Sequence, residues 1–342
     1  MWRPASPWSW AFVGVALFQT LIVLAFEAYI FARFQTDLTG DYSNQTQART
    51  IPTFLTLYCF GFFYQLVLVW DALRLKNTIQ VIGLCLYNVG LLLYGAIQLD
   101  QIRDAVLELQ RLGELKHNIW LEAKPFLIAI PCVLALTTAL MAFIAWKLYD
   151  EFAWTIYKHI SADLRMKKRY LTYQVYIALL KFDFFFFLGF TVQFIVIVKD
   201  KTTTEYVLTI AAIPVTIIIL LFAAFFTRRE NKLGMIITII CYFGALAYFC
   251  FKMFRMYQPS HEDAYKPARK ELTTFAAITI LLIVCTITNA FMCMANFNKG
   301  LKPHVSSRKL SSDEEKLTAG ATEMDSRVGG VAKPAQSRMT ID

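Results

Sequence analysis

Between Pro125 and Trp146 the chain reads PFLIAIPCVLALTTALMAFIAW, without one charged side chain. About 20 apolar residues are what an α-helix needs to cross the hydrocarbon layer of a membrane. Seven other stretches have a similar length and hydropathy. We therefore predict an all-α, polytopic transmembrane helix bundle of about eight spans, with seven as the alternative. The spans are expected near residues 10–32, 52–70, 79–98, 125–146, 176–198, 206–226, 233–251 and 272–294.

The composition of the whole chain agrees with this prediction. Of its 342 residues, 57% are hydrophobic and 17% are charged, whereas a soluble domain has about 45–50% apolar and about 25% charged residues. The seven cysteines fall in the expected spans or at their edges, where they are most simply explained as packing residues. These features exclude a soluble enzyme, a nucleic-acid-binding domain and a secreted disulfide scaffold.

The character of the chain changes after Lys299. Residues 1–299 form the predicted transmembrane helical domain, whereas residues 300–342 contain few large apolar side chains. Such a segment cannot bury enough surface to order itself, so we expect a disordered cytosolic tail. Within it, Ser311 and Ser312 stand between basic and acidic residues. Phosphorylation of these serines would change the charge near the membrane.

The basic residues of the short loops indicate the orientation. Lys and Arg are somewhat more frequent on the side that carries both termini, and their densest cluster consists of Arg165, Lys167, Lys168 and Arg169. The positive-inside rule places that side in the cytosol. Asn44 then lies in a luminal loop, within the N-glycosylation pattern Asn-Gln-Thr.

Two of the loops have helical periodicity. Residues 99–124 read as the third helix continuing out of the membrane and turning near Gly113. In loop 147–172, Phe152, Ile156, Ile160 and Leu164 recur every four residues, which predicts an amphipathic helix on the cytosolic membrane surface. This loop and the tail are candidate binding sites for anionic lipid or a cytosolic protein. The alternative is simple anchoring of the fifth helix.

No pattern points to catalysis. All four histidines lie outside the expected spans, and no pair of them has the spacing of metal ligands. There is no phosphate-binding glycine loop and no dinucleotide motif. We therefore expect no enzymatic activity, no catalytic residues, no cofactor, no metal and no nucleic-acid partner. The third helix also lacks the Asp-Arg-Tyr of a seven-helix receptor, so that function ranks lowest.

Ionisable residues within spans are functional-site hypotheses by default, and this sequence has three: Glu27, Lys181 and Asp183. Lys181 and Asp183 project about 200° apart on a helix, so they should not pair with each other. The interior amides are expected to form hydrogen bonds between helices; they are Gln65, Asn88, Gln193 and Asn289. These side chains form either a structural polar clamp or a substrate or proton path through Asp183, Lys181, Asn88 and Glu27.

One region resembles a known family. It contains Trp154-Thr155-Ile156-Tyr157-Lys158, Ala162-Asp163-Leu164-Arg165, Tyr173-Gln174-Val175-Tyr176 and Leu180-Lys181-Phe182-Asp183, the last followed by a phenylalanine run. Together with Asn296 to Pro303, these motifs are similar to a family of uncharacterised fungal multi-pass membrane proteins assigned to the Golgi apparatus. The resemblance covers about residues 5 to 303. It implies a fungal source, many spans and endomembrane residence, and it carries no known catalytic residues.

Three functions remain open from the sequence. The leading interpretation is a non-enzymatic protein of the Golgi or endomembrane system, acting as a receptor-like scaffold or as a trafficking and homeostasis factor. The alternative is a transporter of a small solute or ion that uses Glu27, Lys181 and Asp183. A seven-helix-like signalling receptor is the lowest option.

Overall fold

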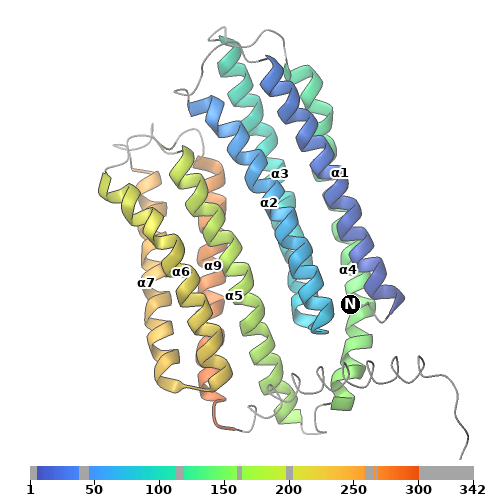
Figure 1. The fold of residues 1–342 in the computed structure, drawn as a ribbon, viewed down its shortest axis with the longest axis vertical. Helices are drawn as coiled ribbons and strands as arrows, with labels where there is room; N and C mark the ends of the chain where they lie inside the picture. Colours follow the sequence, from blue (N-terminus) through green and yellow to red (C-terminus); the bar gives the residue numbers. More distant parts are fainter. Residues whose placement is uncertain are drawn as a thin grey trace, which may run out of the picture. The chain divides into compact units, whose positions relative to one another are not determined.

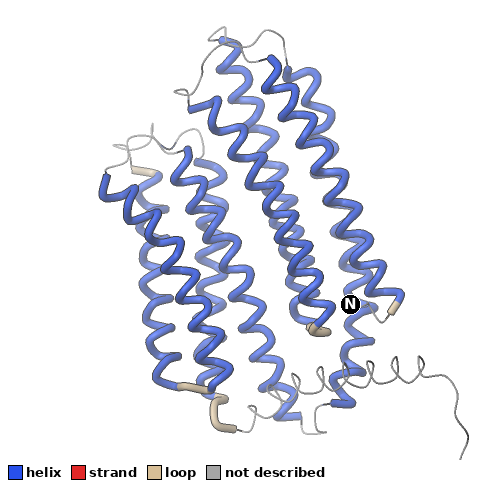
Figure 2. Tube along the Cα trace, in the orientation of Figure 1, coloured by secondary structure: helices blue, strands red, loops and turns tan. Residues whose placement is uncertain are grey.

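The structure is a computed structural model that describes residues 6–37, 46–111, 119–159, 164–197, 203–258, 265 and 269–299. These residues form eight long α-helices and the turns that join them (Figures 1 and 2). The helices are α1 (Pro7–Asp37), α2 (Thr46–Arg74), α3 (Thr78–Arg111), α4 (Ile119–His159), α5 (Leu164–Ile197), α6 (Thr203–Arg229), α7 (Lys232–Met256) and α9 (Arg269–Ala295).

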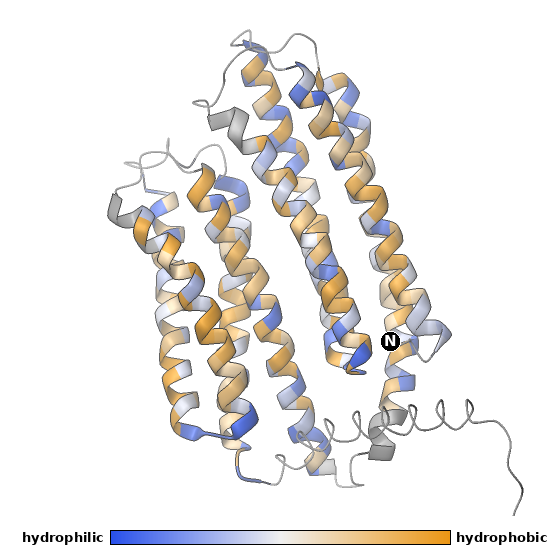
Figure 3. Cartoon of the chain, viewed as in Figure 1, coloured by the Kyte–Doolittle hydropathy of each residue, from blue (hydrophilic) through white to orange (hydrophobic). Residues whose placement is uncertain are grey.

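All eight helices are long and apolar enough to cross a membrane. This confirms the predicted fold class and the count of eight spans. Coloured by hydropathy, the helices are apolar over most of their length, and hydrophilic positions gather toward their ends (Figure 3). Many large apolar side chains face outward, among them Leu86, Leu121 and Phe254. Lipid is the solvent that such an outward surface requires.

The helices pack as two groups of four. In the first group α1 contacts α2, α2 contacts α3, α3 contacts α4, and α4 returns to α1. The second group repeats this order, with α5 against α6, α6 against α7, α7 against α9, and α9 against α5. Figure 1 shows α1 to α4 beside one another and the last four helices beside one another. Each group is therefore a four-helix ring whose neighbours follow the chain.

A single seam joins the two groups. We use this name for the surface where α2 and α3 face α5 and α9. Phenylalanines from the run after Lys181 pack there against glycines of the first group: a Cβ atom added to Gly83 would lie 2.5 Å from the Phe182 ring, and one added to Gly61 would lie 3.2 Å from Phe185. Small residues let neighbouring membrane helices approach closely, so these glycines set the width of the seam.

Two helix boundaries differ from the sequence-based prediction. The span expected to begin at Tyr176 begins at Leu164, so the cluster from Arg165 to Arg169 lies in the first turns of α5 and not in a loop. Hydropathy detects only the apolar part of a helix, whereas Lys, Arg and Leu are good helix formers that extend it. In the same way, α4 continues through His159 as one helix. The predicted separate surface helix is therefore wrong over residues 150–159, and residues 160–163 lie outside the described residues.

Packing assigns residues 1–297 to one compact unit and residues 298–342 to a second. Of the second unit, the structure describes Asn298 and Lys299. The predictions for Asn44, Ser311, Ser312 and the tail lie outside the described residues, as does the turn expected near Gly113. The prediction that α3 continues beyond residue 98 is confirmed, because this helix ends at Arg111.

Candidate functional site

Five polar clusters of the described residues are candidate sites, and the first is a closed cluster of amides in the first group. Gln19 Nε2 donates to Gln65 Oε1 and to Asn88 Oδ1, both over 2.8 Å. Gln65 Nε2 donates to Asn88 Oδ1 over 2.9 Å, and Asn88 Nδ2 donates to Thr138 Oγ1 over 2.7 Å. The cluster thus ties α1, α2, α3 and α4 together. Because its members satisfy one another, it fits a structural clamp.

The second place holds Glu27, which is buried in the first group. Both of its carboxylate oxygens accept from Gln98 Nε2, over 3.2 and 3.3 Å. The described residues provide no cation beside it, since no ion pair includes Glu27. A carboxylate buried without a counter-charge is costly in free energy, so the Gln98 amide is the group that makes this position tolerable.

The third place is an ion pair across the seam. Lys181 Nζ of α5 pairs with Asp71 of α2 and donates to Gln80 Oε1 of α3 over 2.9 Å. Gln80 Nε2 in turn donates to Asp71 Oδ2 over 2.9 Å. The Asn77 side chain caps α3 by accepting from the Gln80 backbone N–H over 3.3 Å, which holds Gln80 beside Asp71. We call Asp71, Gln80 and Lys181 the latch.

The fourth place is a cavity inside the second group. It has a volume of about 40 Å³, and Asp183 forms part of its wall. Thr286 Oγ1 donates to Asp183 Oδ2 over 2.7 Å, whereas Asp183 Oδ1 is buried and has no hydrogen-bond partner among the described residues. The rest of the wall comes from α5, α6, α7 and α9: Phe187, Thr216, Ile219, Leu220, Cys241, Tyr242, Ala245, Thr279 and Ile283.

The fifth place lies where α3, α5 and α9 meet. Glu271 Oε2 accepts from Gln193 Nε2 over 2.8 Å, and the Tyr94 hydroxyl of α3 donates to the Phe54 carbonyl oxygen over 3.1 Å. Glu271 and Gln193 are both fully buried, and each has one side-chain oxygen without a partner among the described residues. Unsatisfied buried acceptors are rare in proteins and mark sites that take up a proton, a water or an ion.

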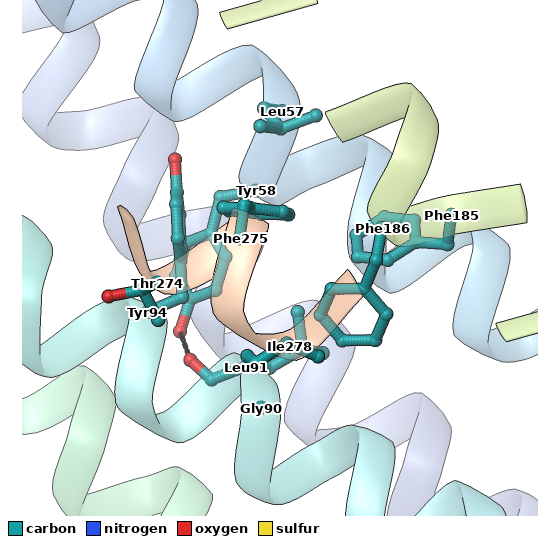
Figure 4. Close-up of a pocket in the computed structure, with 10 residues that line it drawn as sticks. All are labelled: Leu57, Tyr58, Gly90, Leu91, Tyr94, Phe185, Phe186, Thr274, Phe275 and Ile278. Carbon is teal, nitrogen blue, oxygen red and sulfur yellow. Dashed lines mark hydrogen bonds between the residues drawn. The ribbon is translucent and has the colours of Figure 1, made fainter. Parts of the chain in front are cut away.

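An aromatic layer separates the latch from the Glu271 site. Phe185 and Phe186 of α5 and Phe275 of α9 line a small cavity of about 10 Å³ together with Tyr58 and Tyr94. Figure 4 shows these rings gathered around the cavity, and its dashed line marks the hydrogen bond from the Tyr58 hydroxyl to the Leu91 carbonyl oxygen over 3.1 Å. The seam is therefore filled by aromatic side chains between its two polar ends.

The structure places the sequence-predicted polar residues in separate clusters. Lys181 and Asp183 do not pair, as predicted, because Lys181 joins the latch and Asp183 faces the cavity. Asn88 belongs to the amide cluster and Gln193 to the Glu271 site. The Asn289 side chain accepts from Cys293 Sγ of its own helix and forms no hydrogen bond to another helix among the described residues, where the prediction of an interhelical bond is therefore wrong. Within the described part of the chain, these side chains are not joined to one another by one continuous series of hydrogen bonds.

Sequence reasoning missed two buried charged residues, each by one position. Glu271 precedes the span expected at 272–294, and Lys252 follows the span expected at 233–251. Glu271 lies four residues before Phe275 and eight before Thr279, so all three are on the buried face of α9. This helical spacing is the feature of the sequence by which Glu271 could have been predicted to be buried. Lys252 is also buried, with its Nζ 3.7 Å from the centroid of the Phe194 ring, a cation–π contact.

The basic cluster begins α5. Arg165 and Lys168 are exposed, and Lys167 and Arg169 are half-buried. Its predicted contacts with anionic lipid or a cytosolic protein stay a prediction. Among the described residues there is no group of three His, Cys, Asp or Glu side chains that could hold a metal ion.

Comparison with known proteins identifies the family. No family model and no solved structure matches the chain. A curated relative, a UPF0658 Golgi apparatus membrane protein of Schizosaccharomyces pombe, is 33% identical over 314 residues, which cover 86% of this chain and 88% of the relative. The chain is therefore a multi-pass membrane protein that belongs to the UPF0658 family.

Proposed function

We propose that this chain is a non-enzymatic, cation-coupled carrier of a small solute in the Golgi membrane. The observation that carries the proposal is the placement of its carboxyl groups. Asp183 and Glu271 are buried in membrane-spanning helices, and each has one oxygen without a partner among the residues that the structure describes. Intramembrane carboxyl groups are costly and mark ion or proton pathways in carriers. A purely structural clamp would have its acceptors satisfied, as the amide cluster does.

The order of helix contacts supports the same function. Four spans return the chain to its starting side, so α1 and α5 enter the membrane from the same face. In both four-helix rings, neighbouring helices follow one another in the order of the chain, and the rings are joined at one seam. This arrangement corresponds to the parallel repeats on which many secondary transporters are built. The latch holds one end of the seam, and at the other end Lys270 lies 4.0 Å from Asp100. Both ends carry ion pairs that can separate and re-form as the groups rock.

The scaffold interpretation depends on other parts of the chain. It requires loop 147–172 and the tail to face the cytosol and to bind proteins or anionic lipid there. Most of the tail and part of that loop lie outside the described residues. With the surface helix replaced by a continuous α4, no described feature favours a scaffold over a carrier. The cytosolic placement of both termini remains part of the proposal.

Proton entry into vesicles tests the carrier. The full chain would be reconstituted into phosphatidylcholine vesicles that enclose a pH-sensitive dye, and chromatographic fractions of a water-soluble yeast extract would be added outside. We expect at least one fraction to accelerate acidification in vesicles with the protein and not in empty vesicles. Asp183→Asn should lose this response at an equal amount of folded protein, whereas Asp104→Asn, the same change at an exposed position of α3, should retain it. No response to any fraction would refute the carrier.

A further inference from the structure

The cavity of the second helix group is chemically unusual for a membrane protein interior. Five of its wall residues are purely apolar: Phe187, Ile219, Leu220, Ala245 and Ile283. The charged group among its wall residues is the Asp183 carboxylate. About 10–15 Å³ of such volume accommodates one water molecule, so a cavity of about 40 Å³ can hold a few waters beside the carboxylate.

The carboxylate is held in one orientation by its partner. Thr286 Oγ1 fixes Asp183 Oδ2 over 2.7 Å, and this leaves Oδ1 as the free acceptor. The Asp183 side chain as a whole is 94% buried, since the residue is 6% exposed. A threonine that donates to one oxygen while the other stays unpartnered leaves a defined position for one further donor.

Among the described residues, those that line the cavity around Asp183 supply no positive charge. On α7 the titratable neighbours are Tyr242 and Cys241, which line the cavity. On α5 the neighbour is Tyr176, whose hydroxyl lies 3.2 Å from that of Tyr242. From α6 and α9 the wall receives the hydroxyls of Thr216 and Thr279. Lys181, two residues away, is bound in the latch with Asp71.

The residues around Asp183 favour a proton over a metal ion as the ligand of the cavity. A metal ion requires several oxygen ligands to replace its hydration shell, whereas Asp183 is the single carboxylate among the wall residues, half of which are purely apolar. A proton needs a single oxygen with a free lone pair, and water in the cavity can deliver it. Taking up a proton also removes the buried negative charge, which lowers the cost of keeping the carboxyl group in this environment.

We infer that Asp183 Oδ1 and its cavity form a proton-binding site of the second helix group, filled and emptied through water in the cavity. In the step, a hydronium ion gives one proton to Oδ1, which yields a neutral carboxylic acid and a water molecule, and release reverses it. The inference deepens the proposed function, since it names the proton as the coupling cation. Glu271 and Glu27 lie in other clusters and are not part of this site.

Infrared difference spectroscopy tests the site without any transport assay. The full chain in lipid nanodiscs would be stepped between acidic and alkaline buffer, and the carbonyl stretch of the protonated carboxylic acid would be followed. We expect a band in the wild type that is lost in Asp183→Asn and retained in Asp104→Asn, a change at an exposed position of α3. Thr286→Val removes the hydrogen bond to Oδ2 and should shift the band without abolishing it, an effect that a distant titrating group would not show.

Several results would overturn the inference. One is an unchanged band in Asp183→Asn that elutes as folded protein in size-exclusion chromatography. Another is a band that sodium ions remove at constant pH in the wild type, because that identifies a metal-ion site. If Asp183→Asn fails to fold, Asp183→Glu replaces it, with a displaced band expected and an identical band contradicting the site. A titrating Asp183 in a protein that moves no protons would refute the carrier and leave the site standing.

Discussion

At the residue scale, the carboxyl groups within the helices differ in the partners that surround them. Asp71 pairs with a lysine and Glu27 is hydrogen-bonded by an amide, whereas Asp183 and Glu271 each retain one oxygen without a partner among the described residues. The first two arrangements serve stability, since a cation or an amide donor lies beside each carboxylate. The last two leave acceptors open inside the membrane, and they are the positions at which we expect proton chemistry.

The pair formed by Glu27 and Gln98 provides a stability test. Gln98→Leu removes the donor and leaves a buried acceptor without this partner, which costs roughly 1–3 kcal/mol. We expect a strong fall in the thermal midpoint of the detergent-solubilised protein, measured by size-exclusion after heating. The double variant Glu27→Leu with Gln98→Leu should regain most of the lost thermal stability, because both polar groups are then absent. A double variant as unstable as the single one would contradict this assignment.

How well the site could be predicted depends on how deeply each residue lies in its span. Glu27, Lys181 and Asp183 stand out in the sequence as charges within apolar stretches. Glu271 and Lys252 do not, because they adjoin the ends of spans that hydropathy locates only to within a few residues. Partners could not be predicted either: Asp183 meets Thr286 across 103 positions of the chain, and a single sequence does not report which helices touch.

At the element scale, the packing of α3 against α5 depends on glycine. An added Cβ atom at Gly83 would lie 2.5 Å from the Phe182 ring, closer than real Cβ contacts occur, whereas at Gly14 of α1 it would meet nothing within 4 Å. The existence of both helices was predictable from hydropathy. Their close approach was not, because it follows from which face of each helix meets the other.

Two matched glycine variants test this packing. Gly83→Ala should push α5 away from α3 or force the Phe182 ring out of position, an overpacking that costs roughly 1–3 kcal/mol. Gly14→Ala adds the same methyl group in open space and should leave the thermal midpoint unchanged or slightly raised. The thermal midpoints of both variants would be measured in the same detergent and compared. Equal midpoints would show that the seam is looser than the structure indicates.

The latch provides a second test at this scale. Lys181 and Asp71 have side chains that are 25% and 35% exposed, so water still screens the pair in part. Lys181→Met should destabilise the protein by roughly 1–2 kcal/mol, between the values for exposed and buried pairs. Exchanging the charges, with Lys181→Asp and Asp71→Lys together, should restore part of this loss in urea unfolding. No restoration would mean that the ion pair does not join α2 and α5.

At the scale of the whole molecule, two rings of equal helix order meet at one seam. The sequence predicted the eight helices, yet it showed no internal repeat, because the repetition lies in the order of contacts and not in matching residues. In the carrier that we propose, protonation of Asp183 in the second ring changes the packing of α5, which carries both Asp183 and the latch residue Lys181. The seam would then open at one end and close at the other.

Hydrogen–deuterium exchange tests this movement most directly. It would be measured on the full chain in nanodiscs at two pH values and corrected for the intrinsic exchange rates. The account predicts that acidification changes exchange in opposite directions at the two ends of the seam, around the turn from Arg74 to Thr78 and around the start of α9 at Arg269. The same step should change neither end in Asp183→Asn. Exchange that is independent of pH at both ends, or that responds equally in Asp183→Asn, would contradict the account.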